Sequence, residues 1–255
     1  MLQYFQLVDM QAKMKMKAQA NKLVLSYLWW VLEPLLFVSL FYFLFEYLLH
    51  RGGEDFFTFL VVGKIIYLWF SKSVVTASMG LVQNKGIIGQ RALPKWIFPM
   101  INIQESTYKS IVSFVLLMIV LMLNGYLPHS AYWQLIPLLM LAYLLICGVG
   151  LFCSLLVTIA HDFSNVIQLG MMCIMFGSGI FWDINSIQNP EVKELIFTYN
   201  PMALLIHDFR QVLMHSQYVD FTRYGFCLFI SLALILFSLH VFKRFNNKVT
   251  RLLFS

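Results

Sequence analysis

The chain has 255 residues, of which 60% are hydrophobic and only 12% are charged. About a quarter of the side chains in soluble domains are charged, so this chain has too few charges to cover a surface that faces water. We therefore exclude a soluble globular protein and expect an integral membrane protein. The net charge of +6 comes from basic residues gathered outside the apolar stretches. That distribution is typical of a membrane surface and not of a nucleic-acid interface.

The first 25 residues are too polar to cross a bilayer, and we expect them to form an interfacial helix. Met10, Met14 and Ala18 share one face of such a helix, and Lys13 and Lys17 lie on the neighbouring face. An apolar face beside a basic one is typical of a helix that lies on a membrane surface.

Six apolar stretches follow, each near the length of about 20 residues that a helix needs to cross a bilayer. They cover residues 27–49, 56–80, 100–123, 133–160, 166–182 and 223–242. Each span is expected to be helical, because lipid offers no hydrogen-bond partner to exposed backbone groups. Basic residues gather in the N-terminal segment, in the loop at 81–99 and after residue 243. This bias predicts that both termini are cytoplasmic.

Residues 183–222 form a different kind of segment, which is half apolar and is interrupted by Pro190 and Pro201. We expect short outer helices that turn back toward the membrane, where they are buried in protein or line water. The whole chain is then one all-helical membrane domain. Its parts are the interfacial helix 1–25, spans one to five within 27–182, an outer gate segment 183–222, span six at 223–242 and a cytoplasmic tail 243–255.

No pattern in the chain is typical of an enzyme or of a metal site. Gly63-Lys64 lacks the upstream glycine and the following Ser or Thr of a phosphate-binding loop. His161-Asp162 and His207-Asp208 are adjacent pairs, whose side chains point in different directions on a helix. We therefore expect no catalytic residue and no bound metal, and we expect any ATP hydrolysis to occur on another chain.

Ionised side chains inside the predicted spans give a stronger functional signal, because they cost free energy in lipid and so face partners or water. Glu33 lies early in span one and Lys72 lies in span two. We interpret these two residues either as a structural contact between helices or as part of a water-filled path. For Lys64, and for the i,i+4 pair Glu105 and Lys109, the alternatives are snorkelling or a surface ion pair on one side and a place in the path on the other.

Aromatic side chains give a second candidate for a path. They are Trp30, Phe37, Phe41 and Phe45, which follow helical spacing in span one, and Phe176, Phe181 and Trp182, which end span five. Aromatic faces stack on sugar rings without requiring one particular sugar, which would suit a conduit for a long glycan. The alternative is that these rings face lipid or belong to the aromatic belt at the membrane interface.

Four blocks of the sequence resemble the permease subunits of type 2 ABC transporters that export O-antigen and capsular polysaccharides. The blocks are YLWWVLEPL at Tyr27–Leu35, the segment Gly63–Ser73 with its WFS, the segment Asn84–Pro99, and the block that begins with YNPM at Tyr199 and ends at Arg210. They keep the family's order and spacing over nearly the whole chain. Lys64 departs from the neutral residue expected in the second block, so no role is carried over to it.

The resemblance implies a homodimer of permeases that is bound to two ABC ATPase subunits and exports lipid-linked polysaccharide across the bacterial inner membrane. ATP and Mg²⁺ would be held by the ATPases, and this chain would hold no cofactor. Its other partners would be membrane lipid and an undecaprenyl-pyrophosphate-linked glycan, without nucleic acid. The resemblance also implies an ATPase contact over 84–98, with Asn84, Lys85, Arg91, Pro94 and Lys95, and short helices at the outer mouth, with Asn200, Pro201 and Arg210.

These implications lead to a hypothesis for the path. The pyrophosphate of the carrier lipid is expected to meet four basic residues at the inner surface, Lys15, Lys17, Lys22 and Arg91, through charge-assisted hydrogen bonds. The glycan would then slide along the aromatic residues and past Glu33 and Lys72. The alternative role for each of these basic residues is to set the topology of the chain.

Two other classes of function remain open on the sequence alone. An ion-coupled secondary transporter could use Glu33 and Lys72, but such proteins normally contain inverted repeats, and none is visible here. A membrane-embedded transferase acting on lipid-linked sugars would need a base or metal-binding carboxylates at one membrane face. Asp162 and Asp183 are isolated and are predicted to lie on opposite sides.

Overall fold

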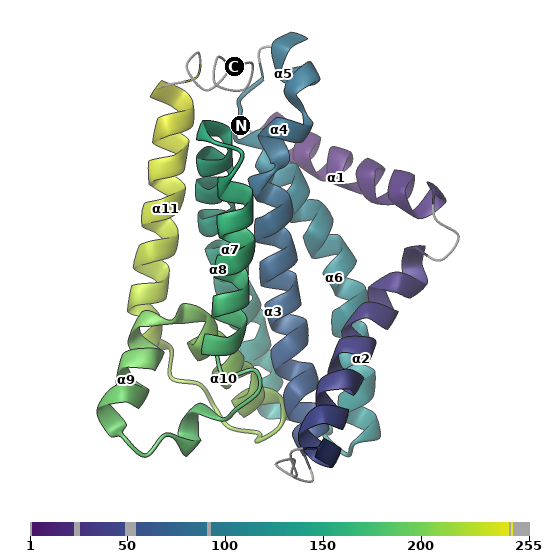
Figure 1. Ribbon diagram of the computed structural model, residues 1–255, viewed down its shortest axis with the longest axis vertical. Helices are drawn as coiled ribbons and strands as arrows, with labels where there is room; N and C mark the ends of the chain where they lie inside the picture. The colour runs from purple at the N-terminus through teal and green to yellow at the C-terminus, as the bar shows by residue number, and fades with distance from the viewer. Residues whose placement is uncertain (1, 23–25, 49–54, 91–92, 245, 247–255) are drawn as a thin grey trace.

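The computed structural model describes residues 2–22, 26–48, 55–90, 93–244 and 246, without the side chains of 2, 19–22, 26–28 and 31. Throughout these ranges the regular elements are helices, as the sequence predicts (Figure 1). Two of the predicted phosphate contacts lie outside the described residues. They are Arg91 and the side chain of Lys22.

Helices occupy all six predicted intervals. They are α2 (Ser26–Phe43) with its π-helical continuation η1 (Leu44–Leu48), α3 (Phe56–Ser78), α6 (Ile97–Leu123), α7 (Leu135–Ile159), α8 (Phe163–Gly177) and α11 (Gly225–Arg244). Two 3-10 turns, η2 (Ser130–Gln134) and η4 (Phe221–Tyr224), lead into α7 and α11. Among the described residues, four helices (α3, α6, and α7 and α11 with their leading turns) are long and apolar enough to cross a membrane, and α8 is a shorter apolar helix. The all-helical membrane fold is confirmed in this form.

Helix α1 (Leu2–Lys22) lies crosswise to the bundle at the end where α11 finishes (Figure 1). Val8 and Ala12 are buried against Ile97 and Ile101 of α6. The predicted apolar face of α1 is turned away from the protein, because Met10 and Met14 are exposed. The helix therefore has one face docked on the bundle and another face free to enter a membrane surface.

Two short helices, α4 (Gly80–Gln83) and α5 (Lys85–Gln90), lie at the same end of the bundle as α1 (Figure 1). Asn84 joins them and donates its side-chain amide to the carbonyl of Gly80 at 2.7 Å. Leu81 and Ile88 pack in a small core that includes Phe98 of α6. Of the segment 84–98, for which the sequence predicts an ATPase contact, the structure thus describes α5, residues 93–96 and the first residues of α6 at one end of the bundle.

The predicted outer segment contains a 3-10 turn, η3 (Ile184–Ser186), and two helices, α9 (Pro190–Tyr199) and α10 (Pro201–Leu213). Both helices begin with an Asn-Pro pair. Asn189 accepts the backbone N–H of Glu191 at 2.9 Å, and Asn200 accepts that of Ala203 at 3.1 Å. An asparagine at the N-cap satisfies a free N–H group, and a proline at the first helical position has none to satisfy. Local sequence alone therefore starts these helices.

Candidate functional site

The aromatic residues predicted from spans one and five meet in the structure. Phe37, Phe41 and Phe45 follow one face of α2 and η1, with successive ring centroids 4.5 and 6.5 Å apart. Phe181, in the turn after α8, lies opposite them, with centroids 6.3, 4.5 and 6.2 Å from those three rings. Phe176 is 5.4 Å from Phe181. We call these five rings the aromatic wall; at these separations aromatic rings attract one another.

A cavity of about 690 Å³ opens at one end of the aromatic wall. Phe45, Phe181 and Trp182 line it together with the carboxylates of Asp55 and Asp183. The indole of Trp182 is fixed, because its N–H donates to the carbonyl of Phe176 at 3.0 Å. Sugar rings have apolar faces and a rim of hydroxyl groups, so rings beside carboxylates offer both kinds of contact that a sugar uses.

Lys64 lies behind the aromatic wall. Only 4% of the residue is exposed, and its Nζ is 3.1 Å from the ring centroid of Phe37 and 3.4 Å from the sulfur of Met175. The interpretation of Lys64 as a snorkelling side chain or a surface ion pair is therefore wrong. The ring of α2 and the side chain from α8 cover the ammonium group, and the ring face attracts it electrostatically.

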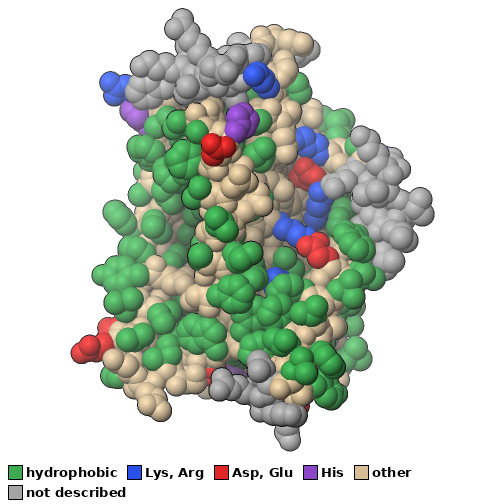
Figure 2. Space-filling model, viewed as in Figure 1, with side chains coloured by type: hydrophobic (Ala, Val, Ile, Leu, Met, Phe, Trp, Pro, Cys, Tyr) green, Lys and Arg blue, Asp and Glu red, His purple; other side chains and the backbone are tan. Residues whose placement is uncertain are grey.

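Glu33 of α2 and Lys72 of α3 form an ion pair. The contact joins two helices, yet 38% of the Glu33 side chain and 48% of the Lys72 side chain remain exposed. Figure 2 shows basic and acidic side chains gathered on this face of the molecule, where α1 and α2 border the bundle. The pair is therefore a structural contact that a bound molecule can also reach.

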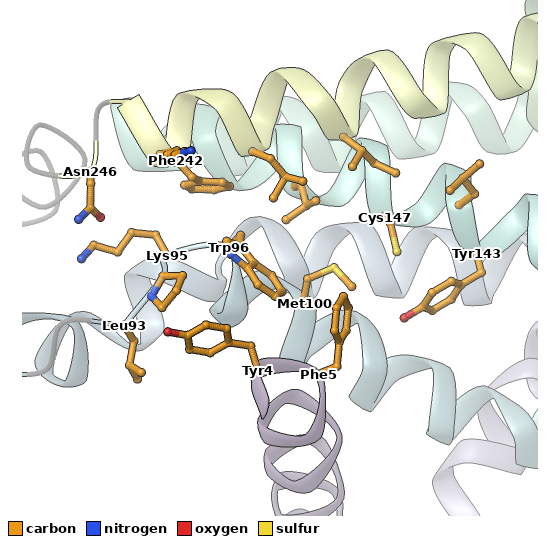
Figure 3. Close-up of a pocket in the computed structure, with 16 residues that line it drawn as sticks. Tyr4, Phe5, Leu93, Lys95, Trp96, Met100, Tyr143, Cys147, Phe242 and Asn246 are labelled. Carbon is orange, nitrogen blue, oxygen red and sulfur yellow. The ribbon is translucent and has the colours of Figure 1, made fainter. Parts of the chain in front are cut away.

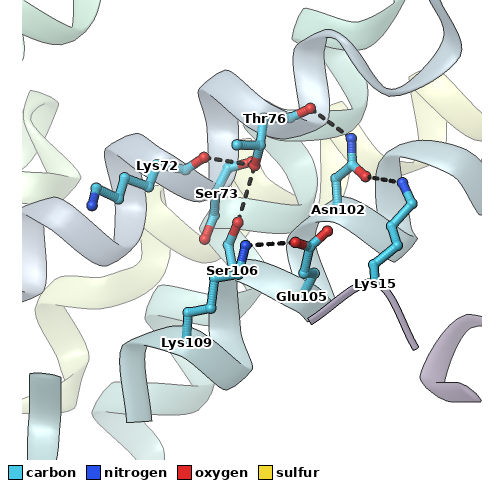
Figure 4. A network of polar contacts seen from close by, with 8 residues as sticks. All are labelled: Lys15, Lys72, Ser73, Thr76, Asn102, Glu105, Ser106 and Lys109. Atoms are coloured by element: carbon cyan, nitrogen blue, oxygen red, sulfur yellow. Dashed lines mark hydrogen bonds and ion pairs between the residues drawn. The ribbon is translucent and has the colours of Figure 1, made fainter. Parts of the chain in front are cut away.

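A network of polar side chains joins α1, α3 and α6 and ends at the backbone carbonyl of Lys72 (Figure 4). Lys15 of α1 donates to Asn102 of α6 at 2.9 Å, and Asn102 donates to the carbonyl of Thr76 on α3 at 2.8 Å. The hydroxyl of Thr76 donates to the carbonyl of Lys72 at 2.7 Å and lies 3.0 Å from that of Ser106. Burial lowers the pKa of Lys15. Sequence reasoning missed Asn102 and Ser106, because a neutral polar residue in an apolar run carries little signal.

The pair Glu105 and Lys109 lies beside this network on α6. The distance from Lys109 Nζ to Glu105 Oε1 is 2.5 Å, and Lys109 Nζ is 5.8 Å from the ring centroid of Trp30. Trp30 thus lies near the charged groups. We define the charged band as Lys15, Glu33, Lys72, Thr76, Asn102, Glu105, Ser106 and Lys109.

The basic residues Lys13 and Lys17 of α1 do not belong to the charged band. Lys13 forms an ion pair with Asp9 at 2.7 Å, and Asp9 also accepts a hydrogen bond from Tyr108 of α6. The hydrogen bonds from Lys13 and Tyr108 lower the pKa of Asp9. Lys17 is exposed. Of the predicted phosphate contacts, Lys15 joins the charged band and Lys17 faces outward.

Arg210 holds three segments together at the end of the bundle that carries α10. The residue is 5% exposed. Its Nε and Nη2 donate to the carbonyl of Phe59 at 3.2 and 3.0 Å. Its Nη1 and Nη2 donate to the carbonyls of Gly179 and Ile180 at 2.6 and 3.0 Å. The guanidinium also lies 3.3 Å from the ring centroid of Phe59. Asn200 completes this corner by donating to the carbonyl of Gly177 at 3.1 Å.

Gly63 of α3 leaves the space that Arg210 fills, because a Cβ on Gly63 would collide with the guanidinium Nη2. We predict that Gly63→Ala lowers the thermal unfolding temperature of the purified protein. Gly170→Ala in α8 is the matched control, since no atom lies within 4 Å of its added Cβ and alanine is favoured over glycine in a helix by about 0.5–1 kcal/mol. Equal unfolding temperatures for the two variants would contradict the prediction.

Helices that can cross a membrane, with charged side chains gathered on one face and a cluster of aromatic rings, are features of a membrane transport protein. No protein-family model matches the chain. Among curated proteins, the chain is 24% identical to an O-antigen export system permease protein of Klebsiella pneumoniae, over 98% of this chain and 95% of that protein. It is 21% identical to the protein of the same name from Myxococcus xanthus, with 86% and 84% covered. It is 25% identical to a polysialic acid transport protein of Escherichia coli, with 78% of each chain covered.

These relatives confirm the resemblance to polysaccharide export permeases that the four sequence blocks indicate. Their names describe transport proteins and not enzymes. The likeness runs along nearly the whole chain, so it covers the segments that carry the aromatic wall, the charged band and Arg210.

Proposed function

We propose that this chain is the membrane-spanning permease of an ATP-driven exporter that moves lipid-linked polysaccharide across the bacterial inner membrane. The observation that carries the proposal is the aromatic wall, which ends in a cavity lined by rings and carboxylates. Such a surface suits a chain of sugars, and it occurs in a protein similar over 98% of its length to an O-antigen export permease.

In this proposal the chain crosses the membrane six times, with both termini in the cytoplasm. Helices at all six predicted intervals support the count. The beginning of α1, the pair α4 and α5, and the end of α11 lie at one end of the bundle (Figure 1). Lys243 and Arg244 in the last turn of α11 favour the cytoplasmic side for that end.

Two copies of the chain enclose the path. Apolar side chains on the flanks of the aromatic wall support this arrangement, because they are exposed on α2 (Trp29, Leu36, Leu40 and Phe43) and on α8 (Val166, Leu169 and Met172). A second copy on these flanks would cover them and close the wall into a conduit. Exposed apolar patches of this kind mark contacts with protein or lipid.

Two ABC ATPase subunits bind the inner end and hold the ATP and Mg²⁺, and this chain holds no cofactor. The ATPase contact lies within residues 84–98, with Asn84, Lys85, Arg91 and Pro94; Lys95 is left out of it, because only 5% of that residue is exposed. Ile87, at the middle of α5, supports this contact, because it is an exposed apolar residue that a partner subunit would cover. Closure of the ATPases would push on α4 and α5, which pack directly on α6 through Leu81 and Ile88.

The diphosphate of an undecaprenyl carrier enters at the inner surface, where four basic residues of the sequence, Lys15, Lys17, Lys22 and Arg91, provide positive charge. The charged band continues this contact into the bundle, because it contains the ammonium groups of Lys72 and Lys109 and the hydroxyls of Thr76 and Ser106. Basic side chains and hydroxyls are the groups that bind phosphate oxygens. The hydrocarbon of the carrier stays in lipid while its head moves along the band.

Binding of the carrier diphosphate by basic residues predicts that neutralising these residues reduces export. Neutralising Lys17, Lys22 and Arg91 together is expected to reduce the polysaccharide on the cell surface, because the carrier head loses its first cations. The ATPase should still co-purify with the variant in normal amount. Lys193→Gln, in the outer helix α9, is the control. Unchanged export by the triple variant would refute the charge assignment.

The aromatic wall predicts a separate effect. Phe41→Leu and Phe181→Leu keep an apolar side chain but remove the ring, and aromatic contacts contribute about 0.5–1.5 kcal/mol each. We expect each substitution to lower transport of lipid-linked glycan in reconstituted vesicles roughly two- to tenfold. Phe229→Leu is the control, because that ring is exposed on α11 away from the wall. Equal losses for all three variants would remove the wall from the path.

A further inference from the structure

A groove of about 820 Å³ lies at the inner end of the bundle, between the first turns of α1, the start of α6, and helices α7 and α11 (Figure 3). Its walls are apolar and include Phe5, Met100, Cys147 and Leu239. The groove contains no residue of the aromatic wall or of the charged band. It is therefore separate from the proposed path of the glycan.

The groove has the length of a lipid chain. It runs on α7 from Tyr143 to Leu151 and on α11 from Ile235 to Lys243, and each stretch rises about 12 Å at 1.5 Å per residue. Half the hydrocarbon core of a bilayer is about 15 Å thick. Since α7 and α11 are long and apolar enough to cross a membrane, we expect the deep part of the groove to lie at the depth of the bilayer.

Positive charge lies at one end of the groove. Lys95 and Lys243 line that end, and Lys95 is 5% exposed. Figure 3 shows its ammonium group directed toward the side where Asn246 lies, away from Cys147 and Tyr143. An anion at this end of the groove would be attracted by both ammonium groups. An apolar groove with cations at its inner end matches a molecule that has a hydrocarbon chain and an anionic head.

An aromatic ring at the inner end of the groove is also exposed to solvent. Phe5 of α1 contacts Trp96, with ring centroids 5.9 Å apart, yet 56% of Phe5 is exposed. Tyr4 of the same turn reaches the edge of Trp96 at 6.4 Å. A hydrocarbon chain in the groove would cover the exposed ring of Phe5 and so hold the first turn of α1 against α11.

We propose that this groove binds one anionic phospholipid of the inner leaflet. One acyl chain lies between α7 and α11, and the phosphate is bound by Lys95 and Lys243. The lipid ties the first turn of α1 to the inner ends of α6 and α11. This inference takes the cytoplasmic side of the groove from the proposed function, but it holds whichever glycan the chain exports.

Native mass spectrometry of the purified full chain tests the inference, with phosphatidylglycerol, phosphatidylcholine and undecaprenyl phosphate as probes. We expect one phosphatidylglycerol retained per chain. Leu239→Trp fills the groove and should lose the lipid, whereas Leu236→Trp should keep it, because Leu236 is on the same helix but 66% exposed outside the groove. Replacing Lys95 and Lys243 by Gln should reduce the preference for phosphatidylglycerol about fivefold for each lysine.

Three results would overturn the inference: retention of the lipid by Leu239→Trp, equal binding of the two phospholipids, or retention of undecaprenyl phosphate alone. If Leu239→Trp does not accumulate, Cys147→Phe gives the same measurement by filling the groove from α7. These readouts count bound lipid and not export, so a failure of the proposed export function would leave them unchanged.

Discussion

Replacing Arg210 by leucine is expected to destabilise the protein more than any other single substitution considered. The guanidinium donates to the carbonyls of Phe59, Gly179 and Ile180. Leucine would leave the buried carbonyls of Gly179 and Ile180 without this donor, whereas the Phe59 carbonyl, inside α3, still accepts the helical N–H four residues later. An unsatisfied buried polar group costs about 1–3 kcal/mol, so the loss is several kcal/mol even if some acceptors find other donors. We expect little folded protein in the membrane and a markedly lower unfolding temperature for what remains.

Arg223→Leu is the matched control, because Arg223 is an exposed arginine in the neighbouring turn η4. The unfolding temperature of Arg210→Lys should lie between those of the unchanged protein and of Arg210→Leu. One ammonium group cannot reach three carbonyls in the geometry of the planar guanidinium. The measurement is thermal unfolding in detergent together with the amount of protein in the membrane fraction. If Arg210→Leu unfolded at the temperature of Arg223→Leu, the carbonyls of Gly179 and Ile180 would have to be satisfied by something other than this side chain.

Helical periodicity explains why the sequence could predict one side of the aromatic wall. Phe37, Phe41 and Phe45 are four residues apart, so any helix over this stretch places them on one face. The sequence also predicts Phe181 as a path residue. Its position opposite these three rings, however, depends on the turn after α8. Gly179 there has a φ of +69°, which glycine adopts readily. That turn brings together residues more than a hundred positions apart in the chain.

The partners of Lys64 and Arg210 could not be predicted from the sequence, for a different reason. Arg210 was predicted as part of an outer gate, but its acceptors are backbone carbonyls, which every residue has and which leave no trace in the sequence. Lys64 is covered by side chains from α2 and α8. Charge and periodicity identify which residues are unusual, whereas their partners depend on the packing of helices that are distant in sequence.

The intervals of the helices were the most predictable feature, because lipid requires long apolar segments and closed backbone hydrogen bonding. Boundaries shifted by a few residues: the predicted stretch 166–182 corresponds to α8 at 163–177, followed by a turn. This difference has a local cause, since Gly177 and Gly179 bracket the end of the helix and allow the chain to turn toward α2. The aromatic residues at 181 and 182 then lie across the wall instead of continuing a helix.

Reversing the charge of Lys72 is expected to have the largest effect on export. Lys72→Glu would set two carboxylates against each other, where Lys72 now pairs with Glu33, and like charges in contact cost several kcal/mol. We expect surface polysaccharide to fall by about tenfold or more. We expect Glu33→Gln to reduce surface polysaccharide less, because it removes the carboxylate but leaves the lysine available for phosphate.

The double variant Glu33→Lys with Lys72→Glu separates the two interpretations of this pair. It restores an ion pair between α2 and α3, so a purely structural contact would recover both the amount of protein and the export. If Lys72 also meets the diphosphate of the carrier, the ammonium group must project from α3 and not from α2. We therefore expect the swapped protein to accumulate normally and to remain defective in export, measured as surface polysaccharide per permease. Recovery of export would reduce the pair to a structural role. Export that stopped when the ion gradient was collapsed at constant ATP would instead favour an ion-coupled transporter.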